Sequence, residues 1–555
     1  MSELDRRHFM KLVGLSAGAA AAAGCSDPVE KLVPYVIQPE VITPGIAVEY
    51  ASTCTECPSN CGLHVKTREA RPIKLDGNPN HPINGSVICA RGQAAIARPY
   101  LPQRYEGPMQ RSADGSFEKT SWDVAQAALI SKVGAKGART VVLGGQVGPT
   151  LSGVIDEWVR AVRGKRVVYE PFSYESLREA SERVLGVRAL PSFDLSKSDL
   201  IVDFGSNFIE TGPFFVELTR QYSEARDLAT HSDGGARMIS IAPRLSLTTG
   251  NADQWIAAKP GSEGPIALAL AAMLHAKGAR TGGDDEAVAA LLGRVNPKKI
   301  AKASGIEFAE LQGLAKQLQA AKAAVALPPG VASTGSNAAS AAAAVLLLNG
   351  LLGAIGGAVQ VPASDVAGAP DSMKTVMGLV QQMKAGKVDV LVIHDSNPIY
   401  SLPTAAGFAE ALKKVGTVIS TATLPDETSV QADWILPQST SLESWGDAEP
   451  RPGIRSIVQP TLRPLHDTKS LGDIFLEAGR AQGGRVASTM PEGSFRQVVQ
   501  AAWSDTDFRK ALARGGVFNP TAPAAVAVTA GVSKISAGMP KLAGDGEFVL
   551  LAYPH

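Results

Sequence analysis

Short apolar runs alternate with longer helical stretches along most of the chain. The runs are rich in Val, Ile and Leu, which is the pattern of buried parallel strands. Strands are predicted over residues 140–143, 166–169, 200–204, 238–241, 323–327, 388–393 and 417–421. Helices are predicted over residues 122–133, 151–162, 213–224, 265–276, 338–348 and 405–414. This alternation of strand and helix predicts the α/β class, with doubly wound layers.

The longest apolar stretch runs over residues 341–359, where Asn349 is the only polar residue. Ala and Gly dominate it, and Asn349-Gly350 and Gly356-Gly357 interrupt it. A membrane span needs about 20 strongly apolar residues. We therefore interpret the stretch as a buried helix followed by a turn and a strand, and keep a membrane segment as the alternative.

Composition narrows the class of protein. The chain has 555 residues, with 54 Lys and Arg against 53 Asp and Glu, and 45% of its residues are apolar. These values exclude a disordered chain and a chain-wide basic surface, so no nucleic-acid partner is expected. The length predicts roughly two to four domains.

The N-terminus has the pattern of an export signal. Arg6-Arg7 precedes a Gly- and Ala-rich apolar stretch over residues 12–24, which is typical of a Tat signal. Ala22-Ala23-Gly24 then leads to Cys25, as in a lipoprotein processing site, although Ala22 stands where Leu is usual. We expect Tat export to the periplasmic side of the cytoplasmic membrane. Cys25 is a candidate lipid anchor, and a plain signal is the alternative.

Four of the five cysteines form one spaced group, Cys54-x2-Cys57-x3-Cys61-x27-Cys89. A close triplet of thiolates with a distant fourth favours a [4Fe-4S] cluster. Zinc more often takes paired C-x2-C motifs or mixed Cys and His ligands. Zinc and disulfides remain the alternatives at this stage.

The residues around these cysteines resemble the N-terminal iron–sulfur module of the prokaryotic molybdopterin oxidoreductase family, of the dimethyl-sulfoxide-reductase type. The matching segments are Cys54–Leu63, Leu75–Pro79 and Ile88–Gly92. The resemblance implies that Arg91 lies between the cluster and a pterin. It also implies pterin or dinucleotide loops, which would include Gly205, Ser206, Asn207, Gly261, Ser262, Glu263 and Asn397. Molybdopterin guanine dinucleotide is the less favoured second cofactor.

Three departures from the family pattern weaken the case for a molybdenum site. Ala242 stands where the family usually has Asp in an Asp-Pro-Arg motif, and Glu263 stands where a loop usually ends in Asp. The metal-ligand position falls near Ser173. Ser173 is either a molybdenum ligand or an ordinary solvated or helix-capping serine.

Two further segments, 442–453 and 30–35, resemble the large iron–sulfur subunit of alternative complex III, a membrane quinol oxidoreductase. The resemblance implies an electron-transferring oxidoreductase subunit that generally lacks molybdenum. It implies partners in a respiratory complex, including a quinone-binding membrane subunit and a ferredoxin-like module. The alternative is a catalytic molybdenum bis-pterin oxidoreductase acting on a small sulfur compound or oxyanion.

These observations give a domain plan. A signal over 1–25 and an extended tether over 26–50 precede an iron–sulfur module over 51–93, which residues 441–480 are expected to complete. One α/β domain combines 94–170 with 362–440, and a second spans 171–361. Residues 481–555 are expected to form a linker and, over 547–553, the first strand of a C-terminal domain that lies beyond His555.

Overall fold

The computed structural model describes Lys11, Thr43 and residues 45–134, 139–231, 234–331, 333, 335–540 and 544–553. Apart from Lys11, the predicted signal lies outside the described residues, and so does its Cys25. Most of the tether also lies outside them. The chain divides into two units, Met1–Val48 and Glu49–His555. Apart from Val48 itself, every element described below belongs to the second unit.

Two small antiparallel sheets frame the cysteine segment. The first has the order β1 (Val48–Thr53), β2 (Gly62–Arg68), β3 (Arg71–Gly77). The second has the order β17 (Gly446–Ala448), β18 (Ile454–Val458), β19 (Gly516–Phe518). The Thr53 hydroxyl donates to the Ile457 carbonyl at 2.8 Å and joins the two sheets. The short helices α2 (Ala90–Ala94) and η1 (Ala95–Tyr100) follow β3.

The first α/β domain is built on a seven-stranded sheet of order β5-β4-β16-β15-β14-β6-β7. Its parallel strands are β6 (Thr140–Gly144), β7 (Lys165–Val168), β14 (Val390–His394), β15 (Thr417–Ser420) and β16 (Trp434–Ile435). The antiparallel strands β4 (Met109–Arg111) and β5 (Phe117–Lys119) extend one edge.

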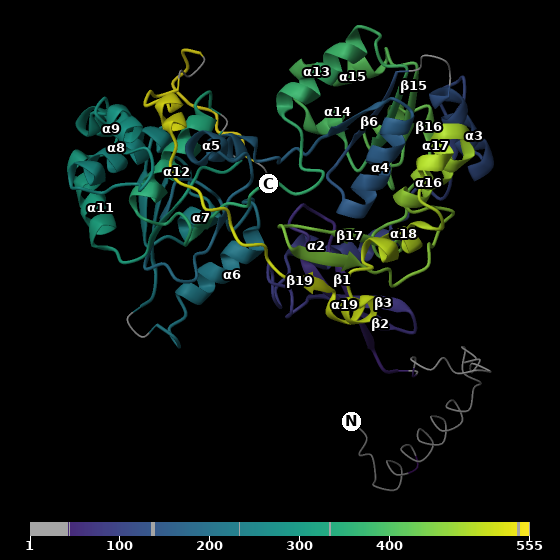
Figure 1. Ribbon diagram of the computed structural model, residues 1–555, viewed down its shortest axis with the longest axis horizontal. Coiled ribbons are helices and arrows are strands. Elements are labelled where there is room, and N and C mark those ends of the chain that lie inside the picture. Colours follow the sequence, from purple (N-terminus) through teal and green to yellow (C-terminus); the bar gives the residue numbers. More distant parts are fainter. Residues whose placement is uncertain are drawn as a thin grey trace, which may run out of the picture. The chain divides into compact units, whose positions relative to one another are not determined.

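Helices cover both faces of this sheet because its side chains alternate between them. Val142 and Val392 pack with the helices on one face, and Leu143 and Leu391 pack on the other. The first face takes α3 (Trp122–Val133), α4 (Pro149–Ala161) and α16 (Leu471–Ala481). The second takes α13 (Met373–Lys384), with α14 (Pro398–Ser401), η2 (Thr404–Ala406) and α15 (Phe408–Leu412). Figure 1 shows α4 and α16 on one side of β6, with α13 and α15 on the other.

The second α/β domain is built on a parallel sheet of order β11-β10-β9-β12. These strands are β9 (Leu200–Asp203), β10 (Arg237–Ala242), β11 (Gln254–Ala257) and β12 (Ala324–Leu327). A separate antiparallel pair joins β8 (Ser192–Phe193) to β13 (Val359–Gln360). The helices are α5 (Glu175–Leu185), α6 (Phe215–Ala225), α7 (Leu247–Gly250), α8 (Glu263–Ala276), α9 (Asp285–Leu292), α10 (Pro297–Ser304), α11 (Phe308–Ala320) and α12 (Ala338–Leu351).

The apolar stretch predicted to be a buried helix is α12, followed by β13, so that prediction is confirmed. The one polar side chain of the stretch 341–359, Asn349, is fully buried and pairs with the backbone of β12. The Asn349 amide donates to the Ala326 carbonyl at 2.8 Å and accepts from the Ala326 N–H at 2.9 Å. Among the described residues, the helices are all too short or too polar to cross a bilayer.

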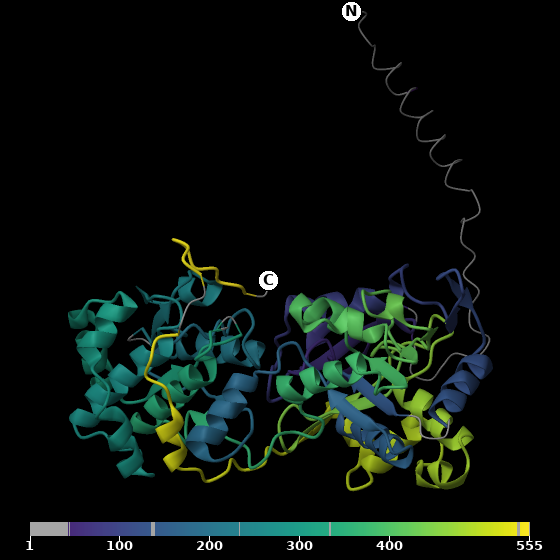
Figure 2. The ribbon, with the colours of Figure 1, turned by 90° about the horizontal axis from the view of Figure 1, so that it is seen from above.

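The predicted α/β class is confirmed, whereas the prediction for the C-terminal stretch is partly wrong. Within 481–545 the chain forms α17 (Gly484–Thr489), α18 (Phe495–Ala502), α19 (Phe508–Arg514) and β19, and then η4 (Ala530–Lys534). Buried Phe495, Val499 and Trp503 anchor this part against α4 and α16. The η4 turn returns to the second α/β domain, where it contacts α5, α9 and α12 (Figures 1 and 2). Residues 544–553 form no strand.

Candidate functional site

The four spaced cysteines lie on a loop and at the start of a short helix. Cys54 follows β1, Cys57 and Cys61 lie in the turn that leads to β2, and Cys89 caps α2. The Cys54 N–H donates to the Cys61 carbonyl at 2.8 Å, which closes the turn. Asn60 adopts φ 44°, a left-handed conformation that Asn tolerates better than most residues. This local geometry brings the triplet together.

The thiols influence one another electrostatically. Burial raises the pKa of the Cys54 thiol to about 12, against a hydrogen bond from the Glu56 N–H. Burial also raises the pKa of Cys61, and the neighbouring Cys54, Cys57 and Cys89 add to the effect. All four cysteines are free of disulfides. No three His, Cys, Asp or Glu side chains in the described part of the chain form a group that could hold a single metal ion.

Such a set of thiols fits an iron–sulfur cluster. Buried thiols ionise only when positive charge is brought to them, and cluster iron brings that charge together with bridging sulfide. Cys54, Cys57, Cys61 and Cys89 would hold the cluster, with Cys54 and Cys61 buried and the other two partly exposed.

Arg91 and the loop before α5 lie near these thiols. The Arg91 guanidinium lies over the Phe215 ring, 5.5 Å from its centroid. Burial raises the pKa of Tyr174, Cys57 adds to the rise, and Arg91 opposes it. The Tyr174 hydroxyl donates to the Thr211 carbonyl at 2.7 Å. Cys57 and Arg91 therefore both lie close enough to Tyr174, the residue after Ser173, to act on it electrostatically.

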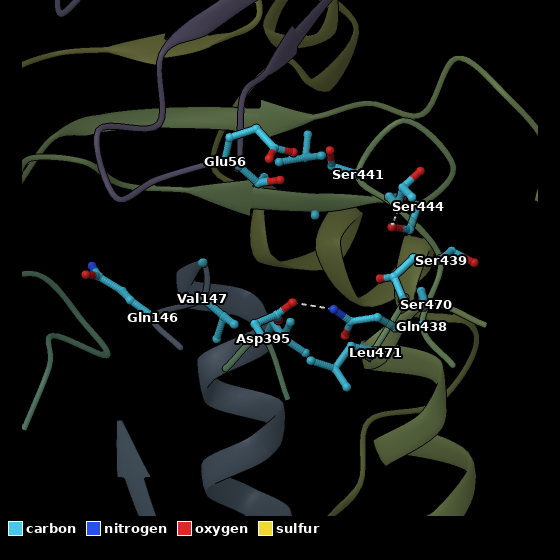
Figure 3. Close-up of a pocket in the computed structure, with 18 of the residues that line it drawn as sticks. Glu56, Gln146, Val147, Asp395, Gln438, Ser439, Ser441, Ser444, Ser470 and Leu471 are labelled. Atoms are coloured by element: carbon cyan, nitrogen blue, oxygen red, sulfur yellow. Dashed lines mark hydrogen bonds between the residues drawn. The ribbon is translucent and has the colours of Figure 1, made fainter. Parts of the chain in front are cut away.

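A cavity of 620 Å³ lies at the carboxyl ends of β6, β14, β15 and β16. Between β6 and β14 the chain order of the sheet reverses, and such a switch point is where open α/β sheets bind ligands. Cys57 and Glu56 contribute to its wall from the cysteine loop, and Asn397 contributes from the loop after β14. Figure 3 shows Glu56 and Asp395 on different walls, with the Gln438 amide donating to the Asp395 carboxylate.

The wall of this first cavity is acidic. Its charged residues are Glu56, Glu170, Asp395, Asp426, Asp447, Glu449 and Arg98. Arg98 is the only cation among them, and it is already bonded to both carboxylate oxygens of Glu56, at 2.9 and 3.0 Å. Burial raises the pKa of Glu170 to about 7, which the Gln146 N–H opposes and Asp395 reinforces.

A second cavity of 550 Å³ lies at the carboxyl ends of β9 and β12, where the order of the smaller sheet reverses. Ser173 and Ser206 both line it, so the structure brings these two predicted residues to one site. Most of its wall is apolar, including Phe172, Phe193 and Phe208. Among the described residues on this wall, Glu175 is the only charged one.

One of the loops predicted to face a dinucleotide already binds a carboxylate of the chain. The buried Asp203 carboxylate accepts from the N–H groups of Gly205 at 3.3 Å and Ser206 at 2.8 Å. It also accepts from the Ser240 hydroxyl at 2.7 Å. At the start of α8, burial raises the pKa of the Glu263 carboxyl to about 7, and its Oε2 has no hydrogen-bond partner in the described part of the chain.

The other predicted loop residues have local partners too. The Asn207 carbonyl accepts from the N–H groups of Glu210 and Thr211, each at 2.9 Å. The Gly261 carbonyl accepts from the Asn337 amide at 2.9 Å, and the Ser262 hydroxyl donates to the Lys259 carbonyl. The Asn397 amide donates to the Glu427 carboxylate at 2.6 Å. Gly261, Ser262 and Glu263 line neither cavity.

The profile of the molybdopterin oxidoreductase family matches residues 104–477, which is more than half of the chain. The profile of the molybdopterin oxidoreductase Fe4S4 domain matches residues 48–101 and covers all four cysteines. The chain belongs to the molybdopterin oxidoreductase family.

Individual members of this family are similar over most of the chain. The molybdopterin-binding-like subunit of the menaquinone reductase of Nitratidesulfovibrio vulgaris is 28% identical, covering 94% of this chain and 77% of its own. The molybdopterin-containing subunit of the thiosulfate reductase of Salmonella typhimurium is 22% identical, covering 86% and 69%. Acetylene hydratase from Pelobacter acetylenicus shares the fold, with a TM-score of 0.72 at 15% identity, over 85% of this chain and 74% of its own.

The family's dinucleotide cofactor does not match the groups at these crevices. A diphosphate is bound by free backbone N–H groups and by cations. Here Asp203 occupies the N–H groups of Gly205 and Ser206, and among the described residues on its wall the first cavity offers one cation, Arg98, which is already paired. The Pro540 ring also lies over the Gly261 turn, where an added Cβ would come within 2.3 Å of it. The residues of this chain therefore fit the cluster and do not fit the dinucleotide.

The sequence reasoning missed the partners of segment 442–453. Glu443 pairs with Arg104, the Asp447 carboxylate accepts from Thr150, and Arg451 pairs with Glu217. These contacts join the segment to both α/β domains. The charges in the segment were visible in the sequence, but their partners lie 234 to 339 positions away.

Proposed function

We propose that this chain is the iron–sulfur, electron-transferring subunit of a membrane-associated respiratory quinol oxidoreductase of the alternative complex III type. It would keep the molybdopterin oxidoreductase fold without molybdenum. The supporting observation is a full set of four thiols, with Cys57 on the wall of the first cavity, together with a loop after β9 whose N–H groups bind the chain's own Asp203 carboxylate. When bound, the cluster would accept and release single electrons.

The relatives support this proposal. The similar menaquinone reductase subunit is itself named molybdopterin-binding-like. In the proposal, quinol is oxidised at a separate membrane subunit, and a ferredoxin-like module exchanges electrons with this chain. Tat export would place the chain on the periplasmic side of the membrane, with Cys25 as a lipid anchor.

Metal analysis of the full chain, purified without oxygen from its natural complex, tests the proposal. We expect about four iron atoms per chain and no molybdenum. Molybdenum with an extractable pterin would overturn the proposal, and the absence of both metals would favour a purely structural subunit. In the Cys57→Ala variant the EPR signal of the reduced cluster should disappear, and a surviving signal would refute the ligand assignment.

A second candidate function is a molybdenum reductase or oxidase for a small sulfur compound or oxyanion. It is favoured by the position of Ser173 on the wall of the second cavity and by the thiosulfate reductase relative. This candidate requires that Ser173→Ala lower the molybdenum content. An unchanged metal content in that variant would remove Ser173 as a ligand.

A further inference from the structure

Glu217 and Arg451 form an ion pair next to the buried cluster that contains Cys54 and Cys61. Glu217 is in the first turn of α6, and Arg451 is in segment 442–453. The Arg451 Nη1 donates to the Glu217 Oε1 at 2.9 Å, and its Nη2 donates to Oε2, so the pair is bidentate. The Glu217 side chain is 5% exposed and that of Arg451 is 24% exposed.

The start of α6 packs directly on the cysteine module. Val216 belongs to the same buried cluster as Cys54 and Cys61, and Phe215 packs against that cluster while lying under Arg91. Glu217 follows these two residues. Its negative charge raises the pKa of the Cys61 thiol, as do the charges of the three other thiols.

The guanidinium of the pair is held in a fixed place. Arg451 lies over the Phe214 ring, 4.3 Å from its centroid, in addition to its bonds to Glu217. Segment 442–453 is fixed on either side of Arg451: the Gly453 N–H donates to Glu449 at 2.8 Å, and Glu443 pairs with Arg104. Two other charges, those of Arg220 and Asp194, also act on Glu217.

A fixed, poorly solvated charge near a redox group changes its reduction potential. Reduction adds one negative charge, so a nearby carboxylate disfavours it and a nearby guanidinium favours it. The effect is larger for buried groups because water screens them less. Ordinary surface pairs would have little influence of this kind.

We propose that the Glu217–Arg451 pair sets the reduction potential of the cluster held by Cys54, Cys57, Cys61 and Cys89. Glu217 supplies the negative charge on the cysteine side, and Arg451 limits its effect. This inference rests on the proposed electron-transfer function and assigns part of segment 442–453 a role in it. Both residues are positioning residues that act through charge, and neither is a cluster ligand.

An EPR-monitored redox titration of the purified complex tests this role, using dithionite as the one-electron reductant at about pH 9, well above the pKa of an ordinary carboxyl group. We expect a higher potential for Glu217→Gln, which leaves the guanidinium unopposed. We expect a lower potential for Arg451→Gln, which leaves the carboxylate unopposed. The double variant should lie between the two single variants.

The matched control is the Arg226–Asp253 pair at the other end of α6. It is also bidentate, at 2.6 and 3.0 Å, and it lies about 14 Å further along the helix. Asp253→Asn should leave the potential unchanged.

The sign of the shift distinguishes charge from structural damage. Equal shifts of one sign in both single variants, or no shift in either, would overturn the inference. If Glu217→Gln fails to assemble, Arg451→Gln decides alone, and an unchanged potential refutes the role. Absence of any cluster signal in the unmodified complex would refute the proposed function itself, whereas a normal signal with unmoved potentials would refute this inference alone.

Discussion

Arg104 and Glu443 form a bidentate ion pair that is completely shielded from solvent. The Arg104 Nη1 lies 3.1 Å from Glu443 Oε1, its Nη2 lies 2.8 Å from Oε2, and both side chains are 0% exposed. Burial alone would raise the pKa of Glu443. Hydrogen bonds from Arg104, the Leu465 N–H and Thr440 outweigh that effect and lower the pKa. The pair ties segment 442–453 to the start of the first α/β domain.

Removing one charge from this pair should be costly. In Glu443→Gln the buried guanidinium keeps its charge and loses its counter-ion, so we expect the free energy of unfolding to fall by about 3–5 kcal/mol. Denaturant unfolding of the purified chain measures this loss. The control is Glu410→Gln in the exposed pair with Lys413, which should change stability by less than about 0.5 kcal/mol. Equal, small effects of both variants would show that the buried pair does not stabilise the fold.

Two glycines at the start of α4 should respond to alanine in opposite ways. An added Cβ at Gly148 would come within 1.8 Å of the Asp447 carbonyl oxygen, so Gly148→Ala must push segment 442–453 away from the first cavity. We expect the free energy of unfolding to fall by about 3 kcal/mol. Gly153 is exposed in the same helix, and nothing lies within 4 Å of an added Cβ. Gly153→Ala should therefore raise the free energy of unfolding by about 0.5–1 kcal/mol. Thermal unfolding of both variants distinguishes steric conflict from helix propensity, and a stabilising Gly148→Ala would contradict the close approach.

Most of the strands that were predicted from the sequence are buried along their whole length. Every residue of β6, β9, β12, β14 and β15 is buried, so each appears as a continuous apolar run. The strands β17, β18 and β19 have three to five residues each, and the pairing of β18 with β19 joins residues up to 64 positions apart, Ile454 and Phe518. Sequence periodicity carries no signal for such pairings.

The candidate site, too, could be predicted only in part from the sequence. Cys54, Cys57, Cys61 and Cys89 could be predicted because their ligand chemistry depends on local spacing. The occupancy of the phosphate-type loops could not be predicted. Gly205 and Ser206 have the composition of a phosphate loop, yet the three-dimensional structure turns Asp203 onto their N–H groups. Whether a backbone N–H is free depends on where a neighbouring side chain turns, and the order of residues does not fix that.

Removing the built-in carboxylate should convert the loop after β9 into an anion site. Asp203→Ala leaves the N–H groups of Gly205 and Ser206 and the Ser240 hydroxyl without this acceptor. We therefore expect the free energy of unfolding to fall by about 3 kcal/mol or more. Inorganic phosphate should then raise the melting temperature of the variant more than that of the unmodified chain, because it can bind the freed donors. Sodium chloride at equal ionic strength is the control. An identical response of both proteins to phosphate would show that Asp203 does not occupy an anion site.

Glu170 in the first cavity should make the stability of the protein depend on pH. Its pKa is raised by burial to about 7, whereas an unfolded Glu titrates near about 4.3. Between these values the folded chain holds a proton that the unfolded chain has released, so folding stability falls as pH rises through this window. Glu170→Gln keeps an acceptor for the Gln146 N–H, which lies 2.7 Å from the carboxylate, but removes the ionisation.

We therefore expect Glu170→Gln to match the unmodified chain near about pH 4.5 and to be more stable above about pH 7, by about 1–3 kcal/mol. Denaturant unfolding at both pH values measures the difference. Some pH dependence should remain, because burial also raises the pKa of Glu263 to about 7. The exposed Glu410→Gln serves as the control and should show no such gain. If the stability of Glu170→Gln falls with pH as steeply as that of the unmodified chain, the Glu170 carboxyl is not the group that holds the proton.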